Sequence, residues 1–179
     1  MQKINVFGIV SWHLNTLRNE KGRLLWSDIG TFYGVPIAMG LVFFLLNWRI
    51  PKDAFGLSIT VFSIFAALLL SVQVALYSVS LRPLLPPNDP KKIKNFEDLK
   101  RSRDSLIREL NDNISYLILL SVLFITMLLA AYVMRCQGPL VSGLVFALYV
   151  HFFLTLLMIV KRASIVFSRE YESRSHDIS

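Results

Sequence analysis

The fold is decided by the stretch Phe55-Gly-Leu-Ser-Ile-Thr-Val-Phe-Ser-Ile-Phe-Ala-Ala-Leu-Leu-Leu-Ser-Val-Gln-Val-Ala-Leu-Tyr-Ser-Val79, in which 25 residues follow one another without an Asp, Glu, Lys or Arg. The hydrocarbon core of a bilayer is about 30 Å thick, so a helix of about 20 apolar residues can cross it. Because a spanning segment must satisfy its own backbone polar groups, this stretch is expected to be one membrane-spanning helix.

Three further stretches of the same kind flank it. They are Ile29–Trp48, Ile114–Met134 and Pro139–Val160, and each also lacks acidic and basic residues. The four stretches make up about half of a 179-residue chain whose mean hydropathy is +0.54. The sequence therefore predicts an all-α, polytopic membrane protein with four transmembrane helices packed as a bundle. Little of the chain remains for a soluble domain.

The basic residues are divided unevenly between the connecting segments. Sixteen of the nineteen Lys and Arg residues lie in 1–28, 81–113 and 161–179, and only three lie in the two short loops. Basic flanking residues are retained on the cytoplasmic side during insertion. We therefore expect both termini and the middle loop to be cytoplasmic.

The predicted organisation alternates cytoplasmic and membrane parts. A cytoplasmic amphipathic helix (1–28) precedes transmembrane helices one and two (29–80). A cytoplasmic proline-rich loop and charged helix (81–113) then lead into transmembrane helices three and four (114–160). A cytoplasmic helix end and tail (161–179) complete the chain, with the helix ending near Tyr171.

The N-terminal segment shows the spacing of a helix with one apolar face. Phe7, Val10, Leu14 and Leu17 recur at intervals of three and four residues. Such a face lies on a membrane surface or packs on the protein's own helices. Because the segment carries little positive charge, packing on the protein is the favoured interpretation.

The middle loop contains a second amphipathic pattern. Four prolines between Pro83 and Pro90 exclude a helix there, and Asn95 is then expected to cap a helix that continues into the third span. The apolar positions of this helix form a narrow seam, which is typical of contact with another helix, and we expect it to pair with the N-terminal helix or with a neighbouring subunit. The candidates for docking a cytoplasmic partner are Leu99, Arg103, Leu106 and Leu110.

Span one carries small residues and a proline. Gly30, Gly34 and Ala38 form an edge at four-residue spacing, and such edges allow close packing of membrane helices. Pro36 has no N–H, so it frees the carbonyl of Phe32 and predicts a kink. Tight packing within the chain is the favoured interpretation. The alternative is a hinge at Pro36 and Gly34 that moves during gating.

Span two repeats the small-residue spacing at Ser63, Ala67, Ser71 and Ala75, with Gln73 nearby. A buried Gln needs a hydrogen-bonding partner across a helix interface. A packing seam is favoured over the alternative, a polar path lined by Ser71 and Gln73.

Span four places an ionisable group deep in the membrane. His151 lies near the centre of the span, one turn from Thr155. A group at this depth faces protein or water rather than lipid. Two roles of His151 remain open. It could make a structural hydrogen bond, or it could lie with Thr155 at a pore or a switchable interface. No second ligand lies within a turn of His151, so no metal site is expected.

Several classes of function are disfavoured. No GxSxG elbow, HExxH helix, paired-carboxylate site or P-loop is present, so no enzyme is expected. The net charge is +7, but acidic residues are mixed among the basic ones and no aromatic platform accompanies them. Direct binding of nucleic acid is therefore not expected, and neither is a cofactor. The single cysteine, Cys136, excludes an internal disulfide.

The runs Gly56-Leu-Ser-Ile-Thr-Val-Phe-Ser-Ile-Phe-Ala-Ala-Leu-Leu-Leu-Ser71 and Leu157-Met-Ile-Val-Lys-Arg162 resemble the second and last spans of small four-span membrane proteins of bacterial anti-phage defence operons, such as the membrane subunit of the Kiwa system. The resemblance covers about a quarter of the chain and carries over no residue role. It implies an inner-membrane component that senses infection, or that damages the membrane when a cytoplasmic partner signals.

These observations lead to three hypotheses. The first is a non-enzymatic, homo-oligomeric effector or sensor of antiviral defence in the inner membrane, which acts as a gated pore under cytoplasmic control. The second is a membrane anchor that docks a soluble cytoplasmic effector without conducting. The third is a small transporter or intramembrane enzyme. The short outer loops, compared with the charged middle loop, favour control from the cytoplasm in each case.

Overall fold

The structure is a computed structural model that describes residues 6–16, 26–82, 93–136 and 138–176, with the backbone alone described at 93–95, 99 and 169–176. The described residues contain helices and no strand. In chain order the elements are α1 (Val6–Asn15), α2 (Trp26–Ile29), the π-helical turn η1 (Gly30–Gly34), α3 (Val35–Leu45), α4 (Lys52–Ser80), α5 (Ile93–Val133) and α6 (Pro139–His176).

Four helical segments are long and apolar enough to cross a membrane, which confirms the predicted fold class. They are Trp26–Leu45, Lys52–Ser80, Phe96–Val133 and Pro139–Ser168. As predicted, the charged helix of the middle loop continues into the third span, as the single helix α5. The fourth helix ends at His176 and so extends beyond the predicted end near Tyr171.

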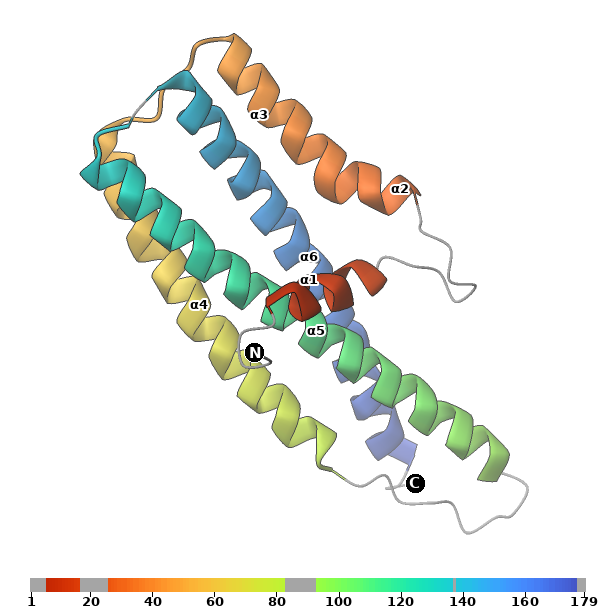
Figure 1. The fold of residues 1–179 in the computed structure, drawn as a ribbon. Coiled ribbons are helices and arrows are strands. Elements are labelled where there is room, and N and C mark those ends of the chain that lie inside the picture. Colours follow the sequence, from red (N-terminus) through yellow and green to blue (C-terminus); the bar gives the residue numbers. More distant parts are fainter. Residues whose placement is uncertain (1–5, 17–25, 83–92, 137, 177–179) are drawn as a thin grey trace.

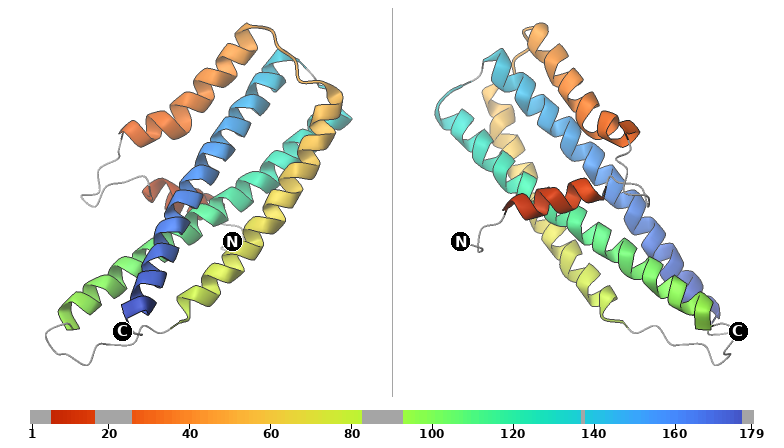
Figure 2. Two further views of the ribbon diagram at one scale, coloured as in Figure 1. Left: turned by 180° about the vertical axis from the view of Figure 1, so that it is seen from behind. Right: turned by 45° about the vertical axis from the view of Figure 1, so that its right-hand side comes forward.

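The long helices form a three-helix core with span one on its flank. α5 packs against both α4 and α6, and α3 packs along α6 (Figures 1 and 2). The rings of Phe62, Phe124 and Phe152 join α4, α5 and α6, with centroids 4.5 Å and 4.8 Å from Phe62. Among the described residues, α3 contacts α6 but neither α4 nor α5. Span one therefore does not close the predicted four-helix bundle.

Glycines on α3 and α6 explain why span one follows span four. A Cβ on Gly40 would lie 2.7 Å from the Gly143 carbonyl oxygen and 2.7 Å from the Ala147 Cβ, so the two backbones touch here. The predicted packing edge at Gly30 and Gly34 is wrong, because nothing lies within 4 Å of a Cβ built at either position. Small residues allow close approach only on the face that meets another helix.

The N-terminal helix α1 crosses the long helices and packs on α5 (Figures 1 and 2). Packing on the protein was the favoured interpretation, but the predicted face is wrong. Phe7 is 85% exposed and Leu14 is 39% exposed, whereas His13 is fully buried. Leu17 lies outside the described residues. α1 thus docks through a polar side chain because α5 offers polar partners at the point of contact.

The outer face of α4 is exposed in the part of the chain that the structure describes. Ser63, Ala67, Ser71 and Ala75 are all exposed, so the predicted packing seam is absent from the chain's own interior. The hydroxyls of Ser63 and Ser71 donate to carbonyl oxygens one turn earlier in α4. Such bonds satisfy a hydroxyl at little cost and need no partner helix.

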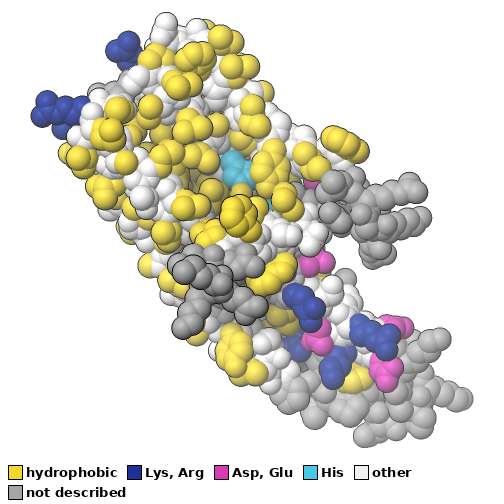
Figure 3. Space-filling view, viewed as in Figure 1, with side chains coloured by type: hydrophobic (Ala, Val, Ile, Leu, Met, Phe, Trp, Pro, Cys, Tyr) yellow, Lys and Arg dark blue, Asp and Glu magenta, His cyan; other side chains and the backbone are white. Residues whose placement is uncertain are grey.

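Apolar and charged side chains occupy different parts of the surface. In Figure 3 hydrophobic side chains cover most of the upper part of the visible face, acidic and basic side chains are mixed at the lower end over the N-terminal part of α5, and further Lys and Arg side chains lie at the upper left. Two short connections lie at the other end of the long helices, where Asn47 and Arg135 adopt left-handed backbone conformations with φ of 58° and 55°. These residues end α3 and α5 and allow the chain to reverse.

Candidate functional site

His151 on α6 connects three segments of the chain. Its Nδ1–H donates to the carbonyl oxygen of Phe32 in η1 at 2.7 Å, and its Nε2 lies 2.8 Å from the hydroxyl of Tyr116 on α5. The carbonyl partner assigns the proton to Nδ1, so Nε2 accepts from Tyr116. Pro36 lacks the N–H that would bond to the Phe32 carbonyl in a regular helix. His151 therefore satisfies the carbonyl that the proline frees.

Two further side chains complete the surroundings of His151. Thr155 is fully buried, and its hydroxyl donates to the His151 carbonyl oxygen at 2.9 Å. The ring of Tyr33 lies 4.9 Å from the His151 ring and tilted to it. The imidazole is 6% exposed. His151 and Thr155, which the sequence singled out together, do lie together in the structure.

His13 brings α1 to the same place. Its ring stacks on Tyr116 with centroids 3.8 Å apart and planes parallel. Its Nδ1 lies 2.7 Å from Asn113 Oδ1, which also accepts from the Thr16 hydroxyl at 2.9 Å. Burial lowers the pKa of His13 from 6.5 to about 4, and the Asn113 bond offsets only part of this effect. His13 is therefore neutral near pH 7.

Arg162 on α6 fixes the C-terminal end of α1. Its guanidinium donates to the Thr16 carbonyl oxygen at 3.1 Å and to Glu109 Oε2 on α5 at 3.0 Å. A cation that binds the last carbonyls of a helix satisfies acceptors that the helix leaves free, and it interacts favourably with the negative end of the helix dipole. The same guanidinium thus joins α1, α5 and α6.

These side chains form one polar assembly, buried at its centre and partly exposed at Glu109 and Arg162, which we call the two-histidine cluster. Its members are His13, Thr16, Glu109, Asn113, Tyr116, His151, Thr155 and Arg162. Two of its atoms, His13 Nε2 and Asn113 Nδ2, are buried without a hydrogen-bonding partner in the described structure.

The other predicted pore residues lie elsewhere. Gln73 on α4 donates to Asn111 Oδ1 at 3.1 Å and to Ser115 Oγ at 3.0 Å, both on α5. It therefore bonds across the α4–α5 interface, as a buried Gln was expected to do. Ser71 lies on the exposed face of α4. The structure thus does not bring Ser71 and Gln73 to a site shared with His151.

The predicted docking residues already have contacts within the chain. Arg103 donates to the carbonyl oxygen of Val79 at 2.8 Å and to that of Arg82 at 3.4 Å, where α4 ends. Leu110 is 1% exposed and belongs to the core, and Leu106 is half-buried against it. The side chain of Leu99 lies outside the described residues. Leu110 is thus not available on the surface for a partner.

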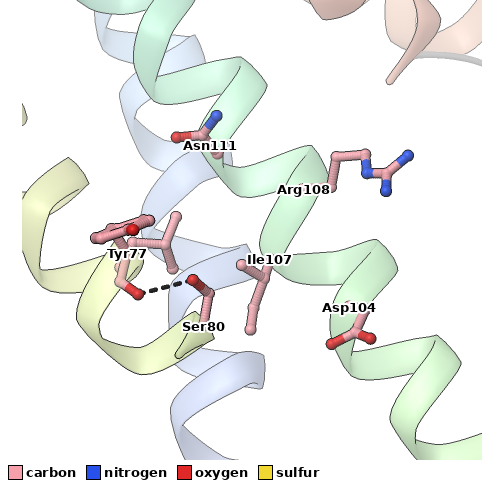
Figure 4. Close-up of a pocket in the computed structure, with 7 residues that line it drawn as sticks. Tyr77, Ser80, Asp104, Ile107, Arg108 and Asn111 are labelled. Atoms are coloured by element: carbon pink, nitrogen blue, oxygen red, sulfur yellow. Dashed lines mark hydrogen bonds between the residues drawn. The ribbon is translucent and has the colours of Figure 1, made fainter. Parts of the chain in front are cut away.

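Besides a small groove of about 190 Å³ that includes Thr16 and Glu109 of the cluster, two larger grooves lie on the described surface. The first, of about 470 Å³ between α4 and α5, is shown in Figure 4. There the Ser80 hydroxyl donates to the Tyr77 carbonyl oxygen at 2.7 Å, and Arg108 points away from both residues. The polar groups of this groove therefore do not converge on one point. The second groove, of about 540 Å³, lies between the start of span one and α6 and has a mainly apolar lining.

His13, Asn113 and Tyr116 were missed from the sequence. His13 lies between residues of the apolar α1 pattern, and neither its position nor its spacing indicates burial. Asn113 and Tyr116 did carry a signal, because they stand three residues apart where the charged part of α5 gives way to the apolar part. Polar residues at that boundary are candidates for an interhelical hydrogen bond.

Comparison with known proteins adds no family assignment. No family model, no curated protein and no solved structure matches the chain.

Proposed function

We propose that this protein is a non-enzymatic membrane effector or sensor, in which the docking of α1 holds the spans in a resting arrangement. The observation that carries the proposal is the two-histidine cluster. It connects α1 to α5, α6 and the freed carbonyl of Phe32 through direct contacts. A change in the position of α1 thus acts directly on the interface between spans one and four.

The energetics of α1 suit a reversible switch. A helix of ten residues is marginal by itself in water, so α1 depends on its contacts with the rest of the chain. The contacts described for α1 include a few hydrogen bonds, each worth about 1 kcal/mol net, and one stacked ring pair. Binding of a cytoplasmic signal or partner to α1 therefore needs to supply only a few kcal/mol to release it.

Release of α1 would reach span one through Tyr116 and His151. Tyr116 loses the stacked His13 ring, and the hydrogen bond from Tyr116 to His151 is then held less firmly. His151 is the partner of the carbonyl freed by Pro36. Gly34 lies two residues before Pro36, and a Cβ built on it would meet nothing within 4 Å. Pro36 and Gly34 are therefore the hinge at which span one moves against α6.

The effector works as a homo-oligomer in the inner membrane, with both termini in the cytoplasm. One chain offers a three-helix core filled by aromatic rings and a flanking span, so a path for ions has to form between copies. The resemblance of spans two and four to membrane proteins of anti-phage operons suggests antiviral defence as the setting. The polar start of α5 is where a cytoplasmic partner would signal.

A flux measurement tests the effector proposal. The full chain is reconstituted in liposomes loaded with a self-quenching dye, and dye release is compared for wild type, His13→Ala and Ser11→Ala. We expect His13→Ala to raise the leak, because it releases α1, whereas Ser11 is exposed on the same helix and serves as the matched control. His151→Ala and Gln73→Leu should also change the leak. Equal, tight vesicles for all variants would rule out the effector proposal.

A membrane anchor is the second candidate, and the exposed charged face of α5 favours it. Glu97, Lys100, Arg101, Asp104 and Arg108 are all exposed on that helix. Pull-down from a lysate with wild type and with a chain carrying Lys100→Glu and Arg101→Glu separates the two functions. One protein captured by wild type alone, together with tight liposomes throughout, would identify an anchor.

A further inference from the structure

The second groove described above has a lining that changes from apolar to charged along α6. We call it the span-one groove. On α6, Leu154, Leu157 and Met158 come first, Lys161 and Arg162 follow one turn later, and Ile165 lies beyond them. The described residues that line it are Asp28, Thr31, Phe32, Leu106, Leu154, Leu157, Met158, Lys161, Arg162 and Ile165. This order matches a lipid, whose tail is apolar and whose headgroup is polar.

The charges on the two walls have opposite signs. Lys161 and Arg162 belong to α6, and Asp28 belongs to α2 at the start of span one. Arg162 uses part of its guanidinium for Glu109 and Thr16, but a guanidinium has five N–H donors, and Lys161 is exposed. A ligand with a phosphate toward α6 and a protonated amine toward α2 would complement both walls.

We propose that the span-one groove binds a phospholipid with a primary amine in its headgroup, of the phosphatidylethanolamine type. The phosphate lies against Lys161 and Arg162, the ammonium group donates to Asp28, and one acyl chain lies along Leu154, Leu157 and Met158. The groove volume of about 540 Å³ is within the range of about 300–1,000 Å³ that ligand pockets occupy. This inference depends on the membrane-spanning helices and not on the effector role.

The occupant is a lipid rather than a soluble molecule because of where the groove lies. Its walls are formed by span one and span four, and their apolar outer faces are exposed in the single chain. Leu157 in the groove is 64% exposed, which suits contact with an acyl chain. A choline headgroup carries the same charge as ethanolamine but has no N–H to donate, so Asp28 distinguishes the two.

Native mass spectrometry of the full chain tests the proposal. The protein is released from vesicles of equal parts phosphatidylethanolamine, phosphatidylglycerol and phosphatidylcholine, and the retained lipids are counted. Wild type should retain phosphatidylethanolamine preferentially. Lys161→Gln should lower phospholipid retention about fivefold, as expected for one basic residue at a lipid headgroup. Lys100→Gln, on the exposed face of α5, is the charge-matched control and should change nothing.

Two more pairs of variants separate the amine contact from the tail contact. Asp28→Asn should remove the preference over phosphatidylcholine, whereas Asp53→Asn, an exposed acid at the start of α4, should keep it. Leu157→Trp should fill the groove and lower retention of every phospholipid, with exposed Leu144→Trp on the same helix as control. Equal retention of the three lipids by wild type would overturn the proposal. So would a Leu157→Trp chain that changes its copy number while its bound lipid stays constant, because the groove would then be a protein interface.

Discussion

At the scale of single residues, His151 and Pro36 act as a pair. The proline leaves a carbonyl oxygen without its helical donor, and the imidazole of another span supplies one at 2.7 Å. A polar residue deep in a span is often taken as a sign of conduction. Here a second role is visible, because the same side chain holds span one against span four. The cost of losing His151 should therefore depend on whether residue 36 is a proline.

A double-mutant cycle measures this dependence. His151→Phe keeps a ring but removes both hydrogen bonds, and we expect it to lower the free energy of unfolding by about 1–2 kcal/mol. In a Pro36→Ala background the loss should be smaller by at least about 0.5 kcal/mol, because the N–H of residue 36 can then bond the Phe32 carbonyl. Unfolding in mixed detergent micelles gives the four values. An equal loss in both backgrounds would contradict the pairing.

His13 makes the docking of α1 dependent on pH. Its pKa is about 4 when docked and 6.5 when free, so the free state binds more protons between these values. Docking is therefore fully favourable above pH 6.5 and weakens as the pH falls toward 4, by up to about 3 kcal/mol. The other charged or titratable groups of the cluster are Glu109, Tyr116, His151 and Arg162, and Tyr33 lies against His151.

Hydrogen exchange of the α1 amides tests this dependence. Protection of wild type should decrease between pH 6.5 and 4 after correction for the intrinsic exchange rate. His13→Phe keeps a ring on Tyr116 but cannot take up a proton, so its protection should change much less over this range. If the two chains lose protection in parallel, another group is responsible.

At the scale of elements, the position of span one depends on one close contact between α3 and α6. A Cβ on Gly143 would lie 2.7 Å from the Gly40 carbonyl oxygen and 3.1 Å from the Phe44 Cβ. The first of these is a backbone atom, which cannot turn aside as a side chain can. The position of α3 therefore depends on its contact with α6, because its other faces meet no other long helix among the described residues.

The same substitution at two glycines shows which contact matters. Gly143→Ala should separate α3 from α6 and lower the free energy of unfolding by about 1–3 kcal/mol, a typical cost of overpacking. Gly34→Ala should be neutral or slightly stabilising, because its Cβ would meet open space and alanine favours a helix. Thermal unfolding in detergent compares the two. Equal melting temperatures would show that the α3–α6 contact is not close.

At the scale of the whole molecule, the charge distribution predicts which end of the helices faces the cytoplasm. The exposed residue Cys136 lies in the short connection after α5, whereas Ser105 lies exposed on the charged part of the same helix. The two positions are therefore expected on opposite sides of the membrane.

Thiol labelling of intact spheroplasts tests the predicted topology. A membrane-impermeant reagent should label Cys136 in intact spheroplasts. A chain carrying Cys136→Ser and Ser105→Cys should be labelled only after lysis. Cys136→Ser alone is the background control. The reverse pattern would place both termini outside, and the basic residues would then not have set the orientation.

The sequence by itself determined the number of spans and the identity of the helices. Whether Phe55 to Val79 can span a bilayer depends on composition within the stretch itself, so it can be read locally. The same holds for the charged helix that continues into the third span. The prediction that His151 faces protein or water also needed only the local sequence, because a polar group deep in a span avoids contact with lipid.

The tertiary structure alone decided which groups meet. His13 and Asn113 are 100 residues apart, and Phe32 and His151 are 119 apart. Small residues at Gly30 and Gly34 have the same spacing as a packing edge, yet in the described structure the close contact is made by Gly40 and Gly143 instead. The physical reason is that lipid surrounds apolar helix faces of every kind equally well, so periodicity does not select a partner. Shape and hydrogen-bonding complementarity between distant segments do.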